Sequence, residues 1–181
     1  MFTLGDGTDP YLGKPEVLPL SAGDAGVFET LNRMRGLVHA ATDYPEVKAA
    51  AVRGLARCPT RNPACQASAL FQFAKDRFRY VPDTLGVEEV TAPWIHSRRI
   101  LDRGATYGDC DDYAVTLAAW LQSVGIPSRF TVVASPKHGG VYDHVRTDAG
   151  VLGRWAPMEA TLTRRKFGES VPAIRTQSLE I

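Results

Sequence analysis

Cys110 is the residue of this 181-residue chain best suited to nucleophilic chemistry, because it stands at the start of a predicted helix. Behind it, apolar residues recur at helical spacing as far as Leu121, and Gly125 and Pro127 predict the stop. At a helix N-terminus, unpaired N–H groups and the macrodipole favour the thiolate, which is the nucleophilic form of cysteine. The alternative is an inert cysteine buried in the core.

Three acidic residues surround this cysteine: Asp109, Asp111 and Asp112. They suit a helix cap and first turn, but their charge opposes a thiolate unless a cationic histidine lies nearby. We expect Asp111 to face solvent and Asp112 to be partly buried, held by Arg129 or by backbone N–H groups of the preceding loop. Asp109, Asp112 and Arg129 would then support the site without taking part in the chemistry.

The histidine must come from four candidates. His39 lies in a predicted helix, His96 in a connecting segment and His138 in a glycine-flanked loop. His144 lies within a predicted strand, where the sheet fixes the direction of the side chain. We therefore expect His144 to be the base beside Cys110.

Glu159 is the candidate third member of such a site. If the hairpin turn is centred between Val151 and Leu152, His144 lies directly opposite Glu159, on the same face and with Cβ atoms about 4.5–5.5 Å apart. A carboxylate there would hold the imidazole in one tautomer. A solvated acid at the end of a strand fits the same pattern equally well.

The elements that must position these residues change in type along the chain. Helical patterns begin at Asp24, Pro45 and about Ala64, and residues 93–101 lead into the cysteine segment. Alternating patterns follow over residues 129–134, 141–147 and 154–158. Helices followed by an antiparallel sheet predict the α+β class.

Composition limits the classes of partner. A hydrophobic content of 44% supports one domain with its own core, over residues 24–163, between an extended arm at 1–23 and a polar tail at 164–181. The net charge of +1 disfavours nucleic acid and anionic membrane as partners. No apolar run could span a bilayer, and the first 20 residues lack the order of a signal peptide.

Cys58 and Cys65 enclose six residues, a loop that could close as a disulfide. The spacing does not match a zinc site, which needs a second pair of ligands. We favour two structural thiols.

A family resemblance rests on several separate segments. They are Phe78-Arg79-Tyr80-Val81-Pro82-Asp83, Val87-Glu88, Pro93, Gly108-Asp109-Cys110-Asp111-Asp112, Gly125-Ile126-Pro127-Ser128-Arg129, His144-Val145 and Trp155-Ala156-Pro157-Met158-Glu159-Ala160-Thr161. Together they resemble the transglutaminase-like superfamily of papain-type thiol enzymes. The branch that they resemble most is the virion-associated or prophage-encoded transglutaminase-like cysteine peptidases of bacteria and phages. The resemblance covers residues 25–162.

This resemblance implies a papain/transglutaminase-like core and thioacyl transfer. Cys110 would attack a peptide or carboxamide carbonyl, His144 would move the proton and Glu159, where the family usually has Asp, would orient His144. Tyr107 and the backbone N–H of Cys110 are our choices as oxyanion donors. Water as acceptor gives a peptidase or amidase, and an amine gives a crosslinking enzyme. Hydrolysis is the more economical choice for a chain of this size.

The resemblance also implies the surroundings of the protein. Its partners would be a peptide or protein substrate, peptidoglycan peptides included, and neighbouring virion proteins. No cofactor is required, and the expected location is the bacterial cytoplasm or a phage virion. Two other readings stay open: a structural phage protein that retains the fold, and a metal site of Cys110, Asp112 and His144, although that ligand set is unusual.

Overall fold

The computed structural model describes residues 21–83 and 89–181, so the expected arm at 1–23 lies outside the described residues except for its last three. The helices are α1 (Asp24–Ala40), α2 (Pro45–Gly54), α3 (Pro63–Arg77), α4 (Pro93–Arg103) and α5 (Cys110–Ser123), with 3-10 turns η1 (Ala41–Asp43) and η2 (Pro136–His138). The strands are β1 (Phe78–Tyr80), β2 (Thr106–Gly108), β3 (Ser128–Ala134), β4 (His144–Val151), β5 (Arg154–Met158) and β6 (Arg175–Glu180).

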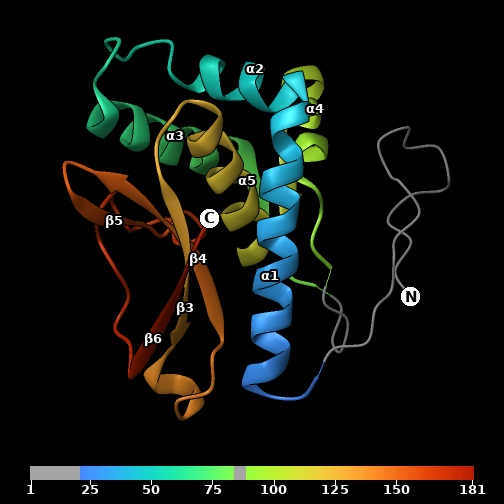
Figure 1. Ribbon diagram of the computed structural model, residues 1–181, viewed down its shortest axis with the longest axis vertical. Coiled ribbons are helices and arrows are strands. Elements are labelled where there is room, and N and C mark those ends of the chain that lie inside the picture. The colour runs from blue at the N-terminus through green and yellow to red at the C-terminus, as the bar shows by residue number, and fades with distance from the viewer. Residues whose placement is uncertain (1–20, 84–88) are drawn as a thin grey trace, which may run out of the picture.

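Helix α5 is the centre of the fold. It contacts each of the other four α-helices and also β3 and β4, so it lies between a helical layer and a sheet (Figure 1). Every residue from 111 to 121 is buried. The sequence pattern predicted a single apolar stripe, whereas a helix covered by two layers is buried on all sides. The whole core therefore fixes the helix that carries Cys110.

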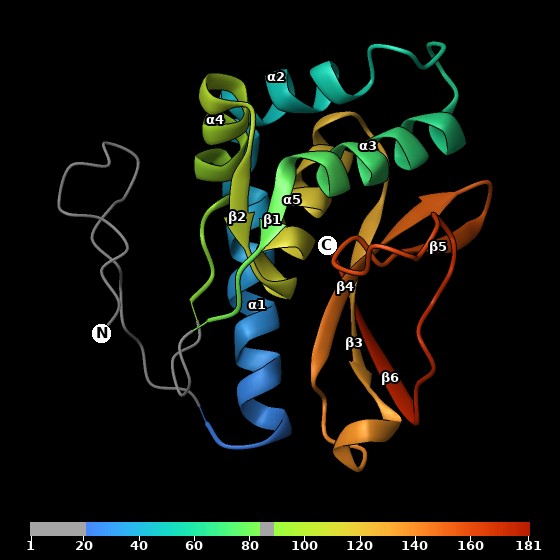
Figure 2. The same ribbon diagram turned by 180° about the vertical axis from the view of Figure 1, so that it is seen from behind.

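The main sheet is antiparallel, in the order β5-β4-β3-β6. A separate parallel pair, β1 and β2, lies beside α5 and is visible from behind (Figure 2). Helices followed by a small antiparallel sheet confirm the predicted α+β class.

The polar tail predicted at residues 164–181 is wrong for its last part. Arg175–Glu180 forms β6 and pairs with β3 along its whole length. Almost all of this edge strand is exposed, so neither of its faces has to be apolar. Its sequence therefore lacks the alternation of apolar and polar residues that indicates a strand. The sheet thus extends beyond the expected boundary at residue 163.

The expected connecting segment that contains His96 is also corrected. It is helix α4, which begins with Pro93 and ends at Arg103. Gly104 follows as the cap, and its φ of 81° is the left-handed conformation that glycine favours. His96 is fully buried on it.

Cys58 and Cys65 are joined in a disulfide, so the expectation of two thiols is wrong. The bond connects the segment after α2 to the first turn of α3, where the Asn62 side chain caps the helix by accepting from the Cys65 N–H at 3.0 Å. Their Cα atoms lie 5.9 Å apart. Cys110 is left as the free thiol.

The β4–β5 hairpin turns one residue later than expected. Val151 pairs with Arg154, and the two residues between them, Leu152 and Gly153, have φ of 53° and 73°. Such two-residue turns match the twist of the strands that they join. The pairing runs to Thr147 and Met158, so Glu159 follows directly after the last paired residue of β5.

Candidate active site

Cys110 is the first residue of α5, and its side chain is half-buried. Asp109 is the N-cap and accepts from the Asp111 N–H at 3.3 Å, while an Asp112 oxygen accepts from the Asp109 N–H at 3.3 Å. These reciprocal bonds form a capping box, which fixes the first turn of the helix. The prediction that a helix begins at Cys110 is confirmed.

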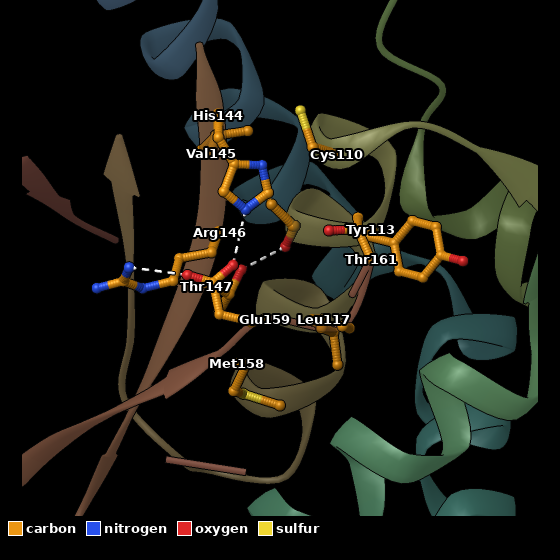
Figure 3. A pocket seen from close by; sticks show the side chains of 12 residues that line it. Cys110, Tyr113, Leu117, His144, Val145, Arg146, Thr147, Met158, Glu159 and Thr161 are labelled. Carbon is orange, nitrogen blue, oxygen red and sulfur yellow. Dashed lines mark hydrogen bonds and ion pairs between the residues drawn. The ribbon is translucent and has the colours of Figure 1, made fainter. Parts of the chain in front are cut away.

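His144 and Glu159 are bound to each other. The Nε2 atom of His144 lies 2.7 Å from a Glu159 carboxylate oxygen. The Glu159 side chain is fully buried, and 18% of the His144 side chain is exposed. Because Glu159 occupies Nε2, the other ring nitrogen is left for Cys110, and Figure 3 shows the imidazole between the two residues. All three line one small pocket.

The charge state of His144 follows from these contacts. Burial lowers the pKa of the imidazole, but hydrogen bonds and negative charge from Cys110 and Glu159 outweigh it and raise the pKa of His144 to about 9. The imidazolium is therefore the stable form at neutral pH. This supplies the cation that the acidic surroundings of Cys110 require.

Glu159 remains ionised although it is buried. Burial raises the pKa of this carboxyl, but the hydrogen bonds and positive charges of His144 and Arg146 bring the pKa below its usual value. Arg146 donates to the second Glu159 oxygen at 3.0 Å. Sequence reasoning missed Arg146, because an arginine that alternates with apolar residues along a strand predicts a solvated face.

The other histidines do not reach this pocket. His39 is exposed on α1, and His138 is exposed beside Asp143 at 3.6 Å. His96 is bound elsewhere, with one ring nitrogen 2.9 Å from the Thr106 hydroxyl and the other 3.1 Å from Asp112. The structure thus brings Cys110 together with the histidine that the strand pattern selected.

Asp112 is buried as expected, and of its two expected partners the backbone N–H groups are present, whereas Arg129 is not. One oxygen accepts from the Thr91 N–H at 2.8 Å and lies beside His96, and the other accepts from the Asp109 N–H. Arg129 instead binds Asp148 through two nitrogens, each at 3.0 Å. Asp112 therefore ties α4 and the loop before it to the turn that presents Cys110.

The expectation that Asp111 faces solvent is wrong. Its exposed fraction is 2%, and no donor reaches either carboxylate oxygen. Burial, followed by the negative charge of Asp109, raises the pKa of Asp111 well above its usual value. The reason is the burial of α5 on all sides, which leaves no solvent face in its first turn.

Two tyrosines lie on the β1–β2 pair. The Tyr107 ring, which we expected at the site, lies under the Arg99 guanidinium at 5.0 Å and is not among the residues that line the pocket. Tyr80, which pairs with Gly108, is 54% exposed. Burial and the nearby charges of Cys110 and Asp109 raise the pKa of Tyr80. Tyr80 also is not among the residues that line the pocket, and the parallel pairing of β1 with β2 has no sequence signal of its own.

The alternative metal site is not assembled in the part of the chain that the structure describes. Both Asp112 oxygens are engaged by Thr91, His96 and Asp109, away from Cys110 and His144. Among the described residues, the carboxylates that could share a metal ion are those of Asp109, Asp111 and Asp112, with one oxygen from each within 4.8 Å of the others. These carboxylates lie at the positive end of α5, which disfavours a cation.

Three solved structures are similar to this chain at low sequence identity. A candidate protease from Parabacteroides distasonis has 17% identity and a TM-score of 0.53, over 72% of this chain and 26% of that one. A candidate cysteine protease from Cytophaga hutchinsonii has 17% identity and a TM-score of 0.46 (81% and 45%), and a structure described as a TGase has 14% identity and a TM-score of 0.41 (85% and 37%). The chain spans less than half of the length of each of these three proteins.

Comparison with curated proteins finds no match. A family model does match: that of the transglutaminase-like superfamily aligns with residues 50–160, which is more than half of the chain. The aligned region contains Cys110, His144 and Glu159. The chain therefore belongs to the transglutaminase-like superfamily.

Proposed function

We propose that this protein is a thiol-dependent hydrolase, a cysteine peptidase or amidase that cleaves an amide bond through a thioacyl intermediate. The observation that carries the proposal is the position of His144 between Cys110 and the buried Glu159 (Figure 3). A histidine whose pKa is raised to about 9 holds a proton at neutral pH and can deliver it to a leaving amine. Cys110, His144 and Glu159 are its catalytic triad.

The reaction has two halves. The Cys110 thiolate attacks the carbonyl carbon, and the C–N bond breaks as the His144 imidazolium gives its proton to the leaving amine. His144, now neutral, takes a proton from water as the oxygen of that water attacks the thioester. The C–S bond then breaks, which releases a carboxylic acid and restores the thiolate and imidazolium. The Cys110 backbone N–H is the oxyanion donor in this scheme.

The substrate class is a peptide or protein, peptidoglycan peptides included. Of the two expected locations, the virion fits better than the bacterial cytoplasm. The reason is the Cys58–Cys65 disulfide, because structural disulfides are rare in the reducing cytosol. No helix formed by residues 21–83 or 89–181 is long and apolar enough to cross a membrane. A phage-encoded enzyme that acts at the cell envelope would retain this disulfide.

Graded-pH alkylation of Cys110 by iodoacetamide tests the proposal. Cys58 and Cys65 are bonded, so Cys110 is the thiol that reacts. An ordinary thiol is less than about 1% ionised at pH 6. We expect rapid alkylation at pH 6 that His144→Asn abolishes. Alkylation at pH 6 that is as slow as in a free thiol, in wild type and variant alike, would favour a structural virion protein that retains the fold.

A second experiment separates hydrolysis from acyl transfer. Wild type and Cys110→Ala are incubated with libraries of peptides and peptidoglycan fragments, with and without a labelled primary amine, and new masses are sought. Cleaved products that only the wild type forms support the hydrolase. Amine adducts without cleavage would show a transglutaminase-type acyl transferase instead.

A further inference from the structure

Arg146 is a buried arginine beside the proposed triad, with 8% of its side chain exposed. It lies two residues after His144 on β4. Its guanidinium donates to Glu159 at 3.0 Å, to the Ser170 hydroxyl at 3.0 Å and to Asp148 at 2.7 Å. The Arg146 side chain therefore links Glu159, which follows β5, to Asp148 on β4 and to Ser170 in the segment before β6.

The two oxygens of Glu159 have separate partners. One is bound by His144 at 2.7 Å and the other by Arg146 at 3.0 Å. A glutamate has one more rotatable bond than an aspartate, so a single hydrogen bond at one oxygen leaves the carboxylate more freedom to turn. The bond from Arg146 removes that freedom and holds the first oxygen on the imidazole.

Arg146 also matters for charge. In the proposed reaction His144 gives up its proton when the amine leaves, and for the life of the thioacyl intermediate it is neutral. Glu159 is fully buried, and a buried carboxylate without a cation takes up a proton. Arg146 is the cation that keeps Glu159 ionised through this stage, so that the carboxylate still accepts from His144.

The guanidinium is itself held in place. Asp148 binds Arg146 with one oxygen, and its other oxygen accepts from Arg129 at 3.0 Å and from the Thr131 hydroxyl at 2.8 Å. Two arginines and two carboxylates therefore alternate in one network, of which Arg146, Asp148 and Glu159 are buried and Arg129 is partly exposed. A network whose members are all satisfied in this way is rigid.

We propose that Arg146 is a positioning residue of the active site, which orients Glu159 and keeps it ionised so that Glu159 can hold His144. This inference rests on the proposed function, because it assumes that His144 serves Cys110.

The test compares Arg146→Met, Arg146→Lys and the matched control Arg129→Met. Arg129 binds the same Asp148 but does not touch Glu159. The readouts are the rate of Cys110 alkylation at pH 6 and at pH 9, and the melting temperature. Arg146→Met should lower the pH 6 rate by about tenfold or more, which is the effect of losing a hydrogen bond to a charged group. Arg146→Lys, which keeps the charge, should recover part of that loss.

The control separates positioning from general stability. Arg129→Met should lower the melting temperature but slow the pH 6 rate less than Arg146→Met does, because Glu159 keeps its hydrogen bond from Arg146. In a Glu159→Gln background, Arg146→Met should change the rate no further, because both substitutions break the same link. If Arg146→Met is poorly folded, Arg146→Lys carries the comparison.

Two outcomes would overturn the inference, and both differ from a failure of the proposed function. The first is a wild-type pH 6 rate in Arg146→Met and Arg146→Lys, with only the melting temperature lowered. The second is equal slowing by Arg129→Met and Arg146→Met. In both cases the wild type still reacts rapidly at pH 6, whereas a slow wild type would reject the thiol hydrolase itself.

Discussion

Glu159 hydrogen-bonds His144 at 2.7 Å although the two residues are not opposite each other in the β4–β5 hairpin. The ladder pairs Thr147 with Met158, so its next step would set Glu159 opposite Arg146. His144 is then a diagonal neighbour, at a distance that only a long side chain bridges. This offset explains how one glutamate reaches both His144 and Arg146.

Glu159→Gln tests the role of this carboxylate. Glutamine keeps the length of the side chain but loses the charge that favours the imidazolium, so we expect turnover to fall by at least about tenfold. Some activity should remain, because Glu159 makes and breaks no bond, whereas Cys110→Ala should leave none. Turnover of a substrate found in the library measures both. Equal and complete loss in two well-folded variants would assign Glu159 a chemical role.

The pKa of His144 predicts how stability depends on pH. Its folded-state pKa of about 9 is above the value of 6.5 for a free histidine, so the protonated form stabilises the fold. This contribution, about 3 kcal/mol at most, is complete below pH 6.5 and is lost as the pH rises through 9. Urea unfolding of wild type and His144→Asn should give a difference that shrinks between pH 6.5 and 9.5. A difference that stays constant over this range would show that the pKa of His144 is not raised.

The register of the hairpin shows why much of the site could be predicted from sequence. The turn lies one residue later than expected, which moves the partner of each β4 residue by two positions. A shift of two keeps every side chain on the expected side of its strand. Glu159 therefore stayed within reach of His144 despite the error.

The features that could not be predicted are polar groups that tertiary packing buries. Arg146 and Asp148 alternate with apolar residues on β4, which predicts a solvated face, but they pair with each other and are buried. Asp111 is buried because helices cover the side of α5 that the apolar stripe left open. Neither burial is encoded in local spacing, since both depend on elements distant in the chain.

Asp111→Asn should stabilise the protein at neutral pH. A carboxyl whose folded-state pKa is raised costs stability once the pH exceeds the unfolded value, about 3.9. Asparagine mimics the neutral form, so the free energy of unfolding should rise at pH 7 and the gain should shrink as the pH falls toward 4. Chemical denaturation at both pH values measures it. A lower stability of Asp111→Asn at pH 7 would mean that the folded protein holds Asp111 as an anion.

Gly108→Ala should destabilise the turn that presents Cys110. A Cβ atom there would lie 2.5 Å from the Asp112 Cβ, on a buried side chain fixed by several hydrogen bonds. Such overpacking typically costs about 1–3 kcal/mol. Gly36→Ala is the control, because a Cβ on that exposed face of α1 meets nothing within 4 Å and alanine favours a helix. Unfolding free energies of the two variants should change in opposite directions.

Asp112→Asn should lower both stability and thiol reactivity. Asp112 accepts from the Thr91 and Asp109 N–H groups and lies beside His96, so both of its oxygens are engaged. In asparagine an NH₂ group replaces one of those oxygens, and at least one buried N–H then loses its acceptor, at a cost of about 1–3 kcal/mol.

The effect should reach Cys110 because the same bonds hold the capping box and the loop before α4 against the first turn of α5. Alkylation at pH 6 should slow together with the fall in melting temperature, whereas Asp111→Asn should shift the melting temperature in the opposite direction. His96→Ala should reproduce the loss of stability, and adding it to Asp112→Asn should cost less than the sum of the two, because they share one contact. Asp112→Asn that melts like the wild type and alkylates at the wild-type rate would show that Asp112 does not fix the turn that presents the nucleophile.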